Sequence, residues 1–204
     1  LNGDHVSQVC PLVQGETFYL QSTFREQLDR LTRKGTRIFS PVMDLTGGIA
    51  DARQPLMETA RHLGISPKTA EAAFNRASAV MQNCLDEMRH IGRQVLDELA
   101  HDPHKIAVVI FARPYTGYVE EANKGIPHKY ASRGIKVLPM DFLDLSGQPG
   151  KRHMYWGMGQ RIMAAAHFVK SHPQLFATYI TNFSCGPDSF LMGYFRDKMG
   201  KKPS

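Results

Sequence analysis

Two cysteines stand in similar places, each just after an apolar run that predicts a β-strand. Cys10 lies in Val-Cys-Pro and Cys185 in Ser-Cys-Gly-Pro. The N-terminus of a following helix would stabilise the thiolate, so these positions suit a metal-ligating or nucleophilic cysteine. Neither belongs to a Cys-x-x-Cys pair, and the alternative is a small residue tolerated in a tight turn. The third cysteine, Cys84, falls on the apolar stripe of a long predicted helix, where we expect a buried, unreactive side chain.

Few other residues carry a legible chemistry. Arg113 follows the central apolar run, where its guanidinium fork suits an anionic group, the alternative being a solvated arginine. Asp44 and Asp141 each follow a predicted strand, and capping is favoured over binding of a hydroxyl group. The sequence has no metalloprotease, dinucleotide-binding or Walker A motif and no nucleophile elbow. No nucleophile–base pair is visible, which disfavours a free-standing hydrolase or transferase.

The central element that must position these side chains spans residues 105–143. Residues 106–111 are all apolar, which is typical of a strand buried on both faces of a parallel sheet. A segment of helical length follows, Gly134 ends it, and a second apolar run covers residues 135–140. This order predicts a βαβ unit with a right-handed crossover. Ligands of such sheets bind beyond the carboxyl ends of the strands, so the loops after both strands are candidate ligand-binding loops.

An internal similarity predicts that the N-terminal part repeats this unit. Residues 34–44 resemble residues 133–141, since each has a basic residue and Gly at a helix end, then a strand that carries Pro, then Asp. A helix is predicted over residues 16–34, a strand over 36–43, and a short strand over 6–10.

We therefore expect an α/β protein with two Rossmann-like lobes that have parallel sheets and are joined by a long helical segment. Residues 1–52 form the first, partial α/β lobe, residues 53–104 a helical connector, and residues 105–204 the second lobe, with its third strand at 175–183. The connector contains one amphipathic helix of about 35 residues, roughly 50 Å long. It begins at Ser66-Pro67, an N-cap followed by a proline at the first helical position.

Composition narrows the function classes. The formal net charge is +6, but the basic residues are spread along the chain, so a nucleic-acid partner is not expected. No apolar run approaches the 18 residues of a membrane span. Three distant cysteines favour a reducing compartment, and we expect a cytoplasmic protein. The start at Leu1 and the end at Lys-Lys-Pro-Ser suggest a piece of a longer protein.

Several strings together resemble the CoA-substrate-specific enzyme activase family. The similarity is closest to the region of its large fused members that is like the 2-hydroxyacyl-CoA dehydratase component, and it covers nearly the whole chain. The most specific string is Asn182-Phe-Ser-Cys-Gly-Pro-Asp-Ser189. The others are Ala112-Arg-Pro-Tyr-Thr-Gly-Tyr118, Asn123-Lys-Gly-Ile-Pro127, Gly134-Ile-Lys-Val-Leu-Pro-Met-Asp-Phe142, Cys10-Pro-Leu-Val-Gln-Gly-Glu16 and Ser40-Pro-Val-Met-Asp44.

The resemblance implies an iron–sulfur system. In such proteins an ATP-hydrolysing activator passes an electron to a dehydratase component, which holds clusters on strand-end cysteines between Rossmann-like lobes. Cys10 and Cys185 are then candidate cluster ligands. Two cysteines do not complete a four-cysteine cluster, so other ligands would come from Cys84, from other sequence or from a partner chain. The candidate substrate-binding residues are Arg113, Tyr115, Asn123, Asp141, Asn182, Ser184 and Asp188.

Two functions remain open on this basis. The first is iron–sulfur-dependent electron transfer to an acyl-CoA, or its dehydration, in partnership with the rest of the polypeptide and its ATP-dependent activator domain. The alternative is a non-catalytic docking module that binds a CoA ester or the activator without a cluster. The activator's phosphate-binding motifs are absent, so no ATP site is expected here, and no complete active site is legible.

Overall fold

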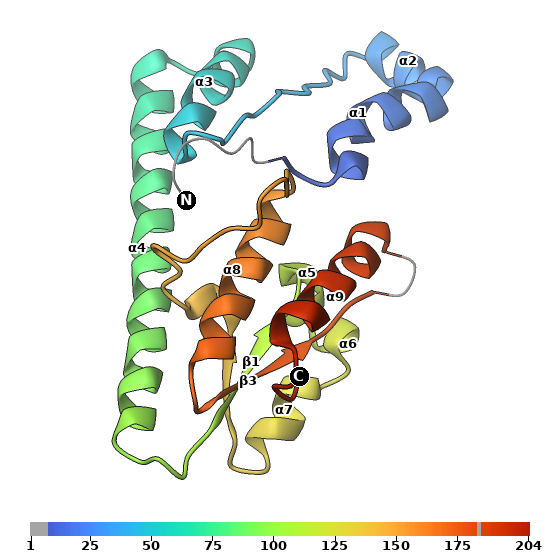
Figure 1. Cartoon of the computed structure of the whole chain (residues 1–204). Helices are drawn as coiled ribbons and strands as arrows, with labels where there is room; N and C mark the ends of the chain where they lie inside the picture. The colour runs from blue at the N-terminus through green and yellow to red at the C-terminus, as the bar shows by residue number, and fades with distance from the viewer. Residues whose placement is uncertain (1–7, 183–184) are drawn as a thin grey trace. The chain divides into compact units, whose positions relative to one another are not determined.

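A computed structural model describes residues 8–182 and 185–204 and divides the chain into two compact units (Figure 1). The first unit ends at Asn83 and the second begins at Cys84. Most of the described residues are helical, and a small parallel sheet lies in the second unit. The predicted α/β class is thus confirmed. The predicted domain boundaries after residues 52 and 104 stay predictions.

The sheet has three parallel strands in the order β2-β1-β3. β1 (Ala107–Phe111) is central and all of its residues are buried, as its unbroken apolar run predicts. β2 (Lys136–Pro139) and β3 (Leu175–Tyr179) flank it, so that Val109 lies opposite Leu138 on one side. The predicted βαβ unit is confirmed.

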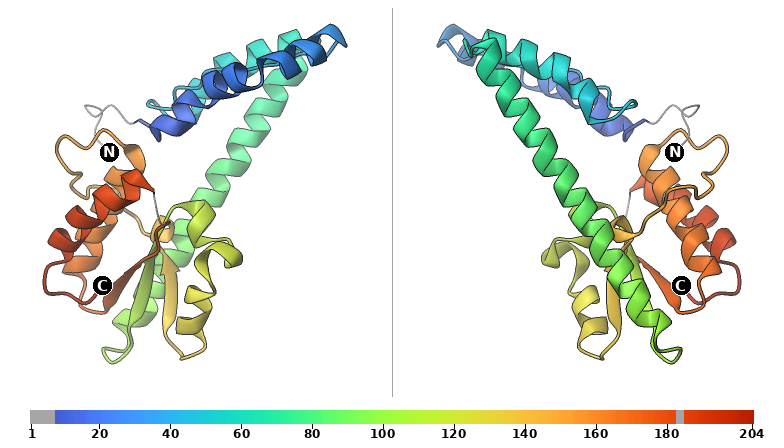
Figure 2. Two further views of the ribbon diagram at one scale, coloured as in Figure 1. Left: turned by 90° about the vertical axis from the view of Figure 1, so that its right-hand side faces the viewer. Right: turned by 90° about the vertical axis from the view of Figure 1, so that its left-hand side faces the viewer.

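Helices cover both faces of this sheet (Figure 2). The short helices α5 (Pro114–Gly117), α6 (Glu120–Asn123) and α7 (Ile126–Ala131) connect β1 to β2. The 3-10 turn η2 (Met140–Phe142) and α8 (Gly157–Ser171) lead from β2 to β3, and α9 (Gly186–Met199) follows β3. The sheet has a separate apolar cluster on each face. α7 packs against one cluster, and α8 and α9 pack against the other.

The larger cluster is the main core of the second unit. Phe111 and Leu138 of the strands pack with Ile162 of α8 and with Leu191 and Phe195 of α9. All five are almost fully buried, and burial of each such side chain contributes about 1.5–3 kcal/mol. The smaller cluster, on the other face, contains Val108, Ile110, Ala112 and Ile180.

The long predicted helix is confirmed as α4 (Pro67–Ala100), of 34 residues, which belongs in part to each unit. Ser66 caps its start, since the Ser66 hydroxyl accepts a hydrogen bond from the backbone N–H of Thr69 at 3.2 Å. In the second unit α4 approaches η2 so closely that a Cβ at Gly92 would lie 1.9 Å from the carbonyl oxygen of Phe142. Only glycine permits this contact.

Cys84 is exposed, so the prediction of a buried cysteine is wrong. The apolar stripe of α4 continues through this region, but no described element covers it. Val80 and Met81, one turn earlier, are exposed as well. Periodicity identified the stripe correctly and could not identify where its packing partners end.

The first unit contains α1 (Pro11–Thr23), α2 (Arg25–Arg33), the 3-10 turn η1 (Ile49–Ala52) and α3 (Arg53–His62). The helix predicted over residues 16–34 is broken in two at Phe24, whose backbone leaves the helical region at φ −107° and ψ 25°.

The strand predicted over residues 36–43 is not formed, because no described segment pairs with it. The strand predicted over residues 6–10 lies partly outside the described residues. The sheet of a first Rossmann-like lobe is therefore not confirmed.

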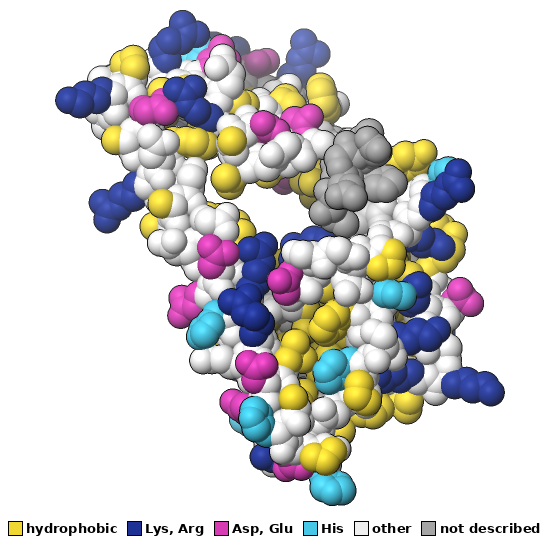
Figure 3. Space-filling model, turned by 60° about the vertical axis from the view of Figure 1, so that its left-hand side comes forward, with side chains coloured by type: hydrophobic (Ala, Val, Ile, Leu, Met, Phe, Trp, Pro, Cys, Tyr) yellow, Lys and Arg dark blue, Asp and Glu magenta, His cyan; other side chains and the backbone are white. Residues whose placement is uncertain are grey.

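Among its described residues the first unit buries only Ala52 in η1 and Ala70 at the start of α4. Many of its large apolar side chains are exposed, for example Phe18 at 73% and Val42 at 86%. On the face drawn in Figure 3, Lys and Arg are interspersed with Asp and Glu and form no single basic patch. No described helix is both long enough and apolar enough to cross a bilayer.

Candidate functional site

At the carboxyl ends of β1 and β3 the chain leaves the sheet toward opposite faces. After β1 the chain turns to α5–α7 on one face, and after β3 it turns to α9 on the other. Ligands of open parallel sheets bind where the loops of adjacent strands diverge in this way. Arg113 follows β1, and Cys185 and Asp188 follow β3, so this edge collects three of the predicted site residues.

Arg113 is the centre of the contacts at this edge. Its Nε donates a hydrogen bond to Asp188 Oδ1 at 3.0 Å, and a terminal guanidinium nitrogen donates to Cys185 Sγ at 2.9 Å. The guanidinium carbon lies 4.8 Å from the Trp156 ring centroid and 5.8 Å from that of Tyr115. The side chain of Arg113 is 10% exposed and that of Asp188 only 2%. The Arg113 cation thus contacts both a buried carboxylate, with which it forms an ion pair, and a cysteine sulfur.

Local structure explains why these side chains meet. Arg113 is the extended residue between buried β1 and Pro114, the first residue of α5. Asp188 occupies the first turn of α9, where the helix dipole favours a carboxylate. Cys185 is the N-cap residue of α9, and its carbonyl accepts the backbone N–H of Ser189 at 2.9 Å. The sequence prediction of a cysteine at the start of a helix is confirmed here.

The charge of Arg113 is well supported. Burial, the largest single influence, lowers the pKa of Arg113, but the negative charge of Asp188 and the hydrogen bond to it outweigh burial and raise that pKa above its ordinary value. The side chain of Arg113 therefore remains a cation, and its hydrogen bond orients the sulfur of Cys185. This arrangement can present the sulfur to a metal or an electrophile at the edge of the sheet.

A second contact joins the same two loops. Asn182 Nδ2 donates to Thr116 Oγ1 at 3.2 Å, and the Asn182 carbonyl accepts the backbone N–H of Cys185 at 3.2 Å. Asn182 thereby positions Cys185. Ser184, the other predicted site residue of this turn, lies outside the described residues.

Sequence reasoning missed Trp156, Thr116 and Tyr179. The Tyr179 hydroxyl is buried and makes no hydrogen bond with any described residue, while its ring packs on Phe195 at 5.1 Å. Burial, and then the negative charge of Asp188, raise the pKa of Tyr179. Its place as the last residue of β3, and the status of Trp156 as the only tryptophan, were the available signals.

A pocket of about 270 Å³ lies beside Arg113, at the carboxyl ends of β1 and β2. Asp141 in η2 accepts hydrogen bonds from the Tyr118 hydroxyl at 2.6 Å and from Arg161 at 2.5 Å. The prediction that Asp141 acts as a cap is therefore wrong, because its carboxylate accepts hydrogen bonds from the side chains of Tyr118 and Arg161 instead. Burial, and then the hydrogen bond with Asp141, raise the pKa of Tyr118. The lining residues are Ile110, Ala112, Arg113, Gly117, Tyr118, Asn123, Pro127, Val137, Pro139 and Asp141.

Asn123, another predicted site residue, shapes the wall of this pocket. It is 6% exposed, its Nδ2 donates to the Gly117 carbonyl at 2.9 Å, and its Oδ1 accepts the Gly125 N–H at 2.8 Å. These bonds fix the loop between α5 and α7. Asp44, by contrast, caps a turn as predicted, because its Oδ1 accepts the backbone N–H of Thr46 at 2.9 Å.

In the first unit Cys10 resembles Cys185 in its position at the start of a helix. It is the N-cap of α1, is half-buried, and makes no side-chain capping hydrogen bond. Across residues 8–182 and 185–204, no group of three or more His, Cys, Asp or Glu residues could hold a metal ion.

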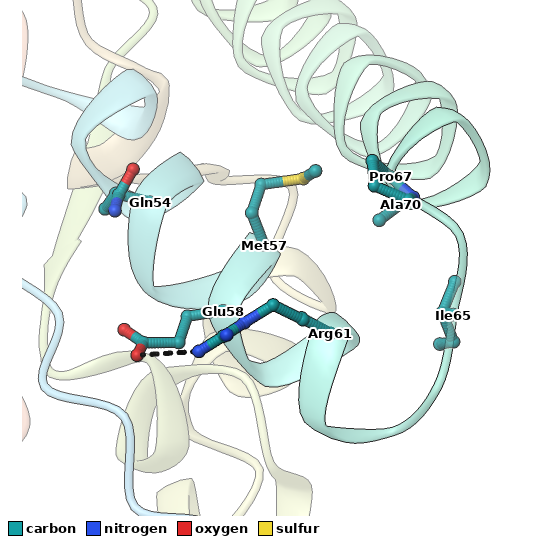
Figure 4. A pocket seen from close by; sticks show the side chains of 7 residues that line it. All are labelled: Gln54, Met57, Glu58, Arg61, Ile65, Pro67 and Ala70. Atoms are coloured by element: carbon teal, nitrogen blue, oxygen red, sulfur yellow. Dashed lines mark ion pairs between the residues drawn. The ribbon is translucent and has the colours of Figure 1, made fainter.

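A wider pocket of about 320 Å³ lies in the first unit, in the bend between α3 and the start of α4 (Figure 4). Met57 projects from α3 toward Pro67, while Glu58 and Arg61 form an ion pair of 3.6 Å along the same helix. The pocket is lined by Gln54, Met57, Glu58, Arg61, Ile65, Pro67 and Ala70.

Comparison with protein families gives one match, to a family described as "CoA enzyme activase uncharacterised domain", over residues 2–143. The matched residues include Cys10, Arg113 and the 270 Å³ pocket, whereas Cys185 and Asp188 lie beyond them. No curated protein and no solved structure matches the chain.

Proposed function

The chain belongs to the CoA enzyme activase uncharacterised domain family, and from this premise we propose that it takes part in iron–sulfur-dependent electron transfer to an acyl-CoA, or in its dehydration. The observation that carries the proposal is the sulfur of Cys185, held at the β1–β3 edge by the buried Arg113–Asp188 pair. The chain would work with an ATP-dependent activator, since it has no phosphate-binding loop of its own.

The contact between Arg113 and Cys185 suits a cluster ligand. Hydrogen bonds to ligating sulfurs and nearby positive charge tune the reduction potential of iron–sulfur clusters. A cluster would supply one-electron transfer, and Arg113 would orient one of its ligands and offset part of its negative charge.

The described residues do not fit a complete cluster. They contain no group of three or more candidate ligands, whereas the common clusters need four. We therefore propose that Cys185 and Cys10 are partial ligand sets, completed by residues of the activator or of another polypeptide segment. Cys84 is exposed on α4 and serves as the natural comparison residue.

The proposal includes the first lobe. Residues 36–43 have a strand-like composition and no pairing partner among the described segments, and Ile38 and Val42 are exposed. We propose that these residues join a parallel sheet when the rest of the assembly is present, which would complete the first Rossmann-like lobe. All three cysteines are free thiols, which suits a cytoplasmic location.

The test is cluster assembly under anaerobic conditions with iron and sulfide on the chain together with its activator, which the proposal requires for the missing ligands. Iron and acid-labile sulfide are assayed and the visible spectrum is recorded for the wild type and for Cys185→Ser, Cys10→Ser and Cys84→Ser. We expect visible absorption that Cys185→Ser abolishes and that Cys84→Ser leaves unchanged. Equal iron retention in Cys185→Ser and Cys84→Ser would overturn the assignment.

The same assay separates the two open functions. If the chain holds no iron with or without its activator, yet still binds the activator or a CoA ester, the docking function replaces the redox function.

A further inference from the structure

We propose that the 270 Å³ pocket beside Arg113 is a binding site for a small, neutral, mainly apolar molecule with one hydrogen-bonding group. The inference goes beyond the proposed function, because it depends on neither an iron–sulfur cluster nor a thioester.

Position is the first argument. The pocket opens at the carboxyl ends of β1 and β2, the edge at which parallel sheets bind ligands, and it lies between the sheet and the short helices α5–α7. Its walls come from β1, β2, η2 and the short helices α5–α7, and they are held by the buried strand β1 and by the hydrogen bonds of Asn123. A preformed pocket of this kind loses little entropy when a ligand binds.

Size is the second argument. A cavity of 150 Å³ lined by apolar side chains accommodates benzene. The present pocket is nearly twice as large, yet it lies below the usual range of about 300–1,000 Å³ for sites that enclose drug-sized ligands. It therefore suits a substituted ring or a branched chain of about ten non-hydrogen atoms.

Wall chemistry is the third argument. Ile110, Ala112, Val137 and the two prolines Pro127 and Pro139 present apolar surface. These residues favour an apolar occupant by roughly 25 cal/mol for each Å² that leaves water.

Charge is the fourth argument and it decides between ligand classes. Among the described residues, the ionised side chains that line the pocket are Arg113 and Asp141, and each already has a partner of opposite charge. Arg113 is paired with Asp188, and Asp141 with Arg161. An anionic or cationic ligand would bury a charge without a free counter-ion, which is costly, whereas a neutral ligand would not.

The Tyr118 hydroxyl supplies the polar end of the site. Its hydrogen is donated to Asp141, so its oxygen can act toward a ligand only as an acceptor. The preferred ligand therefore carries an N–H or O–H group at one end, such as a primary amide.

Three probes of similar size and different charge test this inference on the whole chain: 2-phenylacetamide, phenylacetate and phenethylamine. Binding is measured by saturation-transfer NMR and by the fluorescence of Trp156, the only tryptophan, which stacks on Arg113. We expect 2-phenylacetamide to bind with a dissociation constant on the order of 1 mM, as suits about ten atoms, and at least tenfold more tightly than either charged probe.

Two variants locate the binding. Val137→Phe fills the pocket and should weaken binding of 2-phenylacetamide at least tenfold, whereas Val80→Phe places the same side chain on the exposed surface of α4 and should not change it. Tyr118→Phe keeps the shape of the pocket and removes the acceptor, so it should weaken binding severalfold even if Val137→Phe does not fold. Tighter binding of phenylacetate, or equal binding to Val137→Phe and wild type with both folded, would overturn the inference. Because no iron or CoA is used, this result is separate from that of the cluster assay.

Discussion

Residues 34–44 and 133–141 have similar sequences and reach different structures. Both begin with a basic residue and a glycine of positive φ, +89° at Gly35 and +74° at Gly134. The second segment then forms β2 and pairs along β1, with Leu138 buried. The first stays without a strand partner, and Ile38 and Val42 are exposed.

The difference shows which part of a strand is encoded locally. A glycine in the left-handed region ends the preceding helix in both segments, so the local stop signal works in both. Strand formation needs a neighbour that accepts and donates the ladder hydrogen bonds, and only β1 provides one. The two units differ for the same reason, since the second has a continuous apolar core and the first buries two alanines among its described residues.

The largest expected effect contrasts a buried ion pair with an exposed one. Asp188→Ala leaves the Arg113 cation buried without its partner and should lower the free energy of unfolding by about 3–5 kcal/mol. Glu58→Ala removes the carboxylate that pairs with Arg61 on the surface of the first unit and should cost at most ~1 kcal/mol. Urea unfolding followed by circular dichroism measures both.

A double variant, Arg113→Leu with Asp188→Leu, sharpens the same comparison. Replacing a whole buried pair with apolar residues is often neutral, so this protein should be more stable than Asp188→Ala alone. If Asp188→Ala costs no more than Glu58→Ala, the Arg113–Asp188 pair is solvated and the contrast between the units is wrong.

The next prediction compares the two similar segments, residues 34–44 and 133–141, directly. Leu138→Ala opens a cavity in the core of the second unit and should cost about 2–5 kcal/mol. Ile38→Ala, in the similar segment of the first unit, should change stability by less than ~0.5 kcal/mol. Hydrogen exchange of the β1 amides together with urea unfolding separates the two. An equal loss in Ile38→Ala would mean that the first unit has a packed strand after all.

Sequence patterns predicted the elements whose environment is continuous. The unbroken apolar run of β1 and the stripe and N-cap of α4 were sufficient, because burial on both faces and helical periodicity leave a direct signature. The strand over residues 36–43 failed because pairing is a property of two segments. Cys84 failed because the stripe of α4 is longer than its covered part.

The candidate site was predicted in its parts and not in its connections. Arg113 and Cys185 were identified from their places after strands, which strand topology explains. Their mutual hydrogen bond joins residues 72 positions apart. The stacking of Trp156 on Arg113 adds a third segment of the chain to the site. Such contacts depend on the tertiary fold, so a single sequence could not indicate them.

A smaller effect compares two glutamines. Gln160 is buried and fixes a loop, since its Oε1 accepts the Lys151 N–H at 2.7 Å and its Nε2 donates to the Lys151 and Met154 carbonyls. Gln160→Ala leaves these backbone groups without partners and should cost about 1–3 kcal/mol. Gln14 makes one exposed hydrogen bond to the Val9 carbonyl, so Gln14→Ala should be close to neutral. Thermal unfolding of the pair checks this, and comparable melting shifts would contradict it.

The smallest effect is a pH dependence that belongs to the second unit. Burial, and then the positive charge of Lys202, lower the pKa of His172, whose Nδ1 accepts the backbone N–H of Gln174 at 3.2 Å and so must be neutral. In the unfolded chain a histidine titrates near pH ~6.5. The unfolded state therefore binds more protons between this value and the lowered folded-state pKa, and stability is full above pH ~6.5 and falls as the pH decreases through that interval.

The first unit should not share this dependence. Hydrogen bonds from Thr46 lower the pKa of Asp44, and those from Arg53 lower the pKa of Glu71, so their contributions are lost only in the acid range below pH ~4. Urea midpoints at pH 7.5 and 5.5 should therefore differ for the wild type and converge in His172→Asn, which keeps an acceptor and does not titrate. If His172→Asn retains the full difference, another group causes it. If it abolishes the difference, the pH response is assigned to the unit that contains the packed sheet, because His172 is half-buried there beside the Lys202 cation.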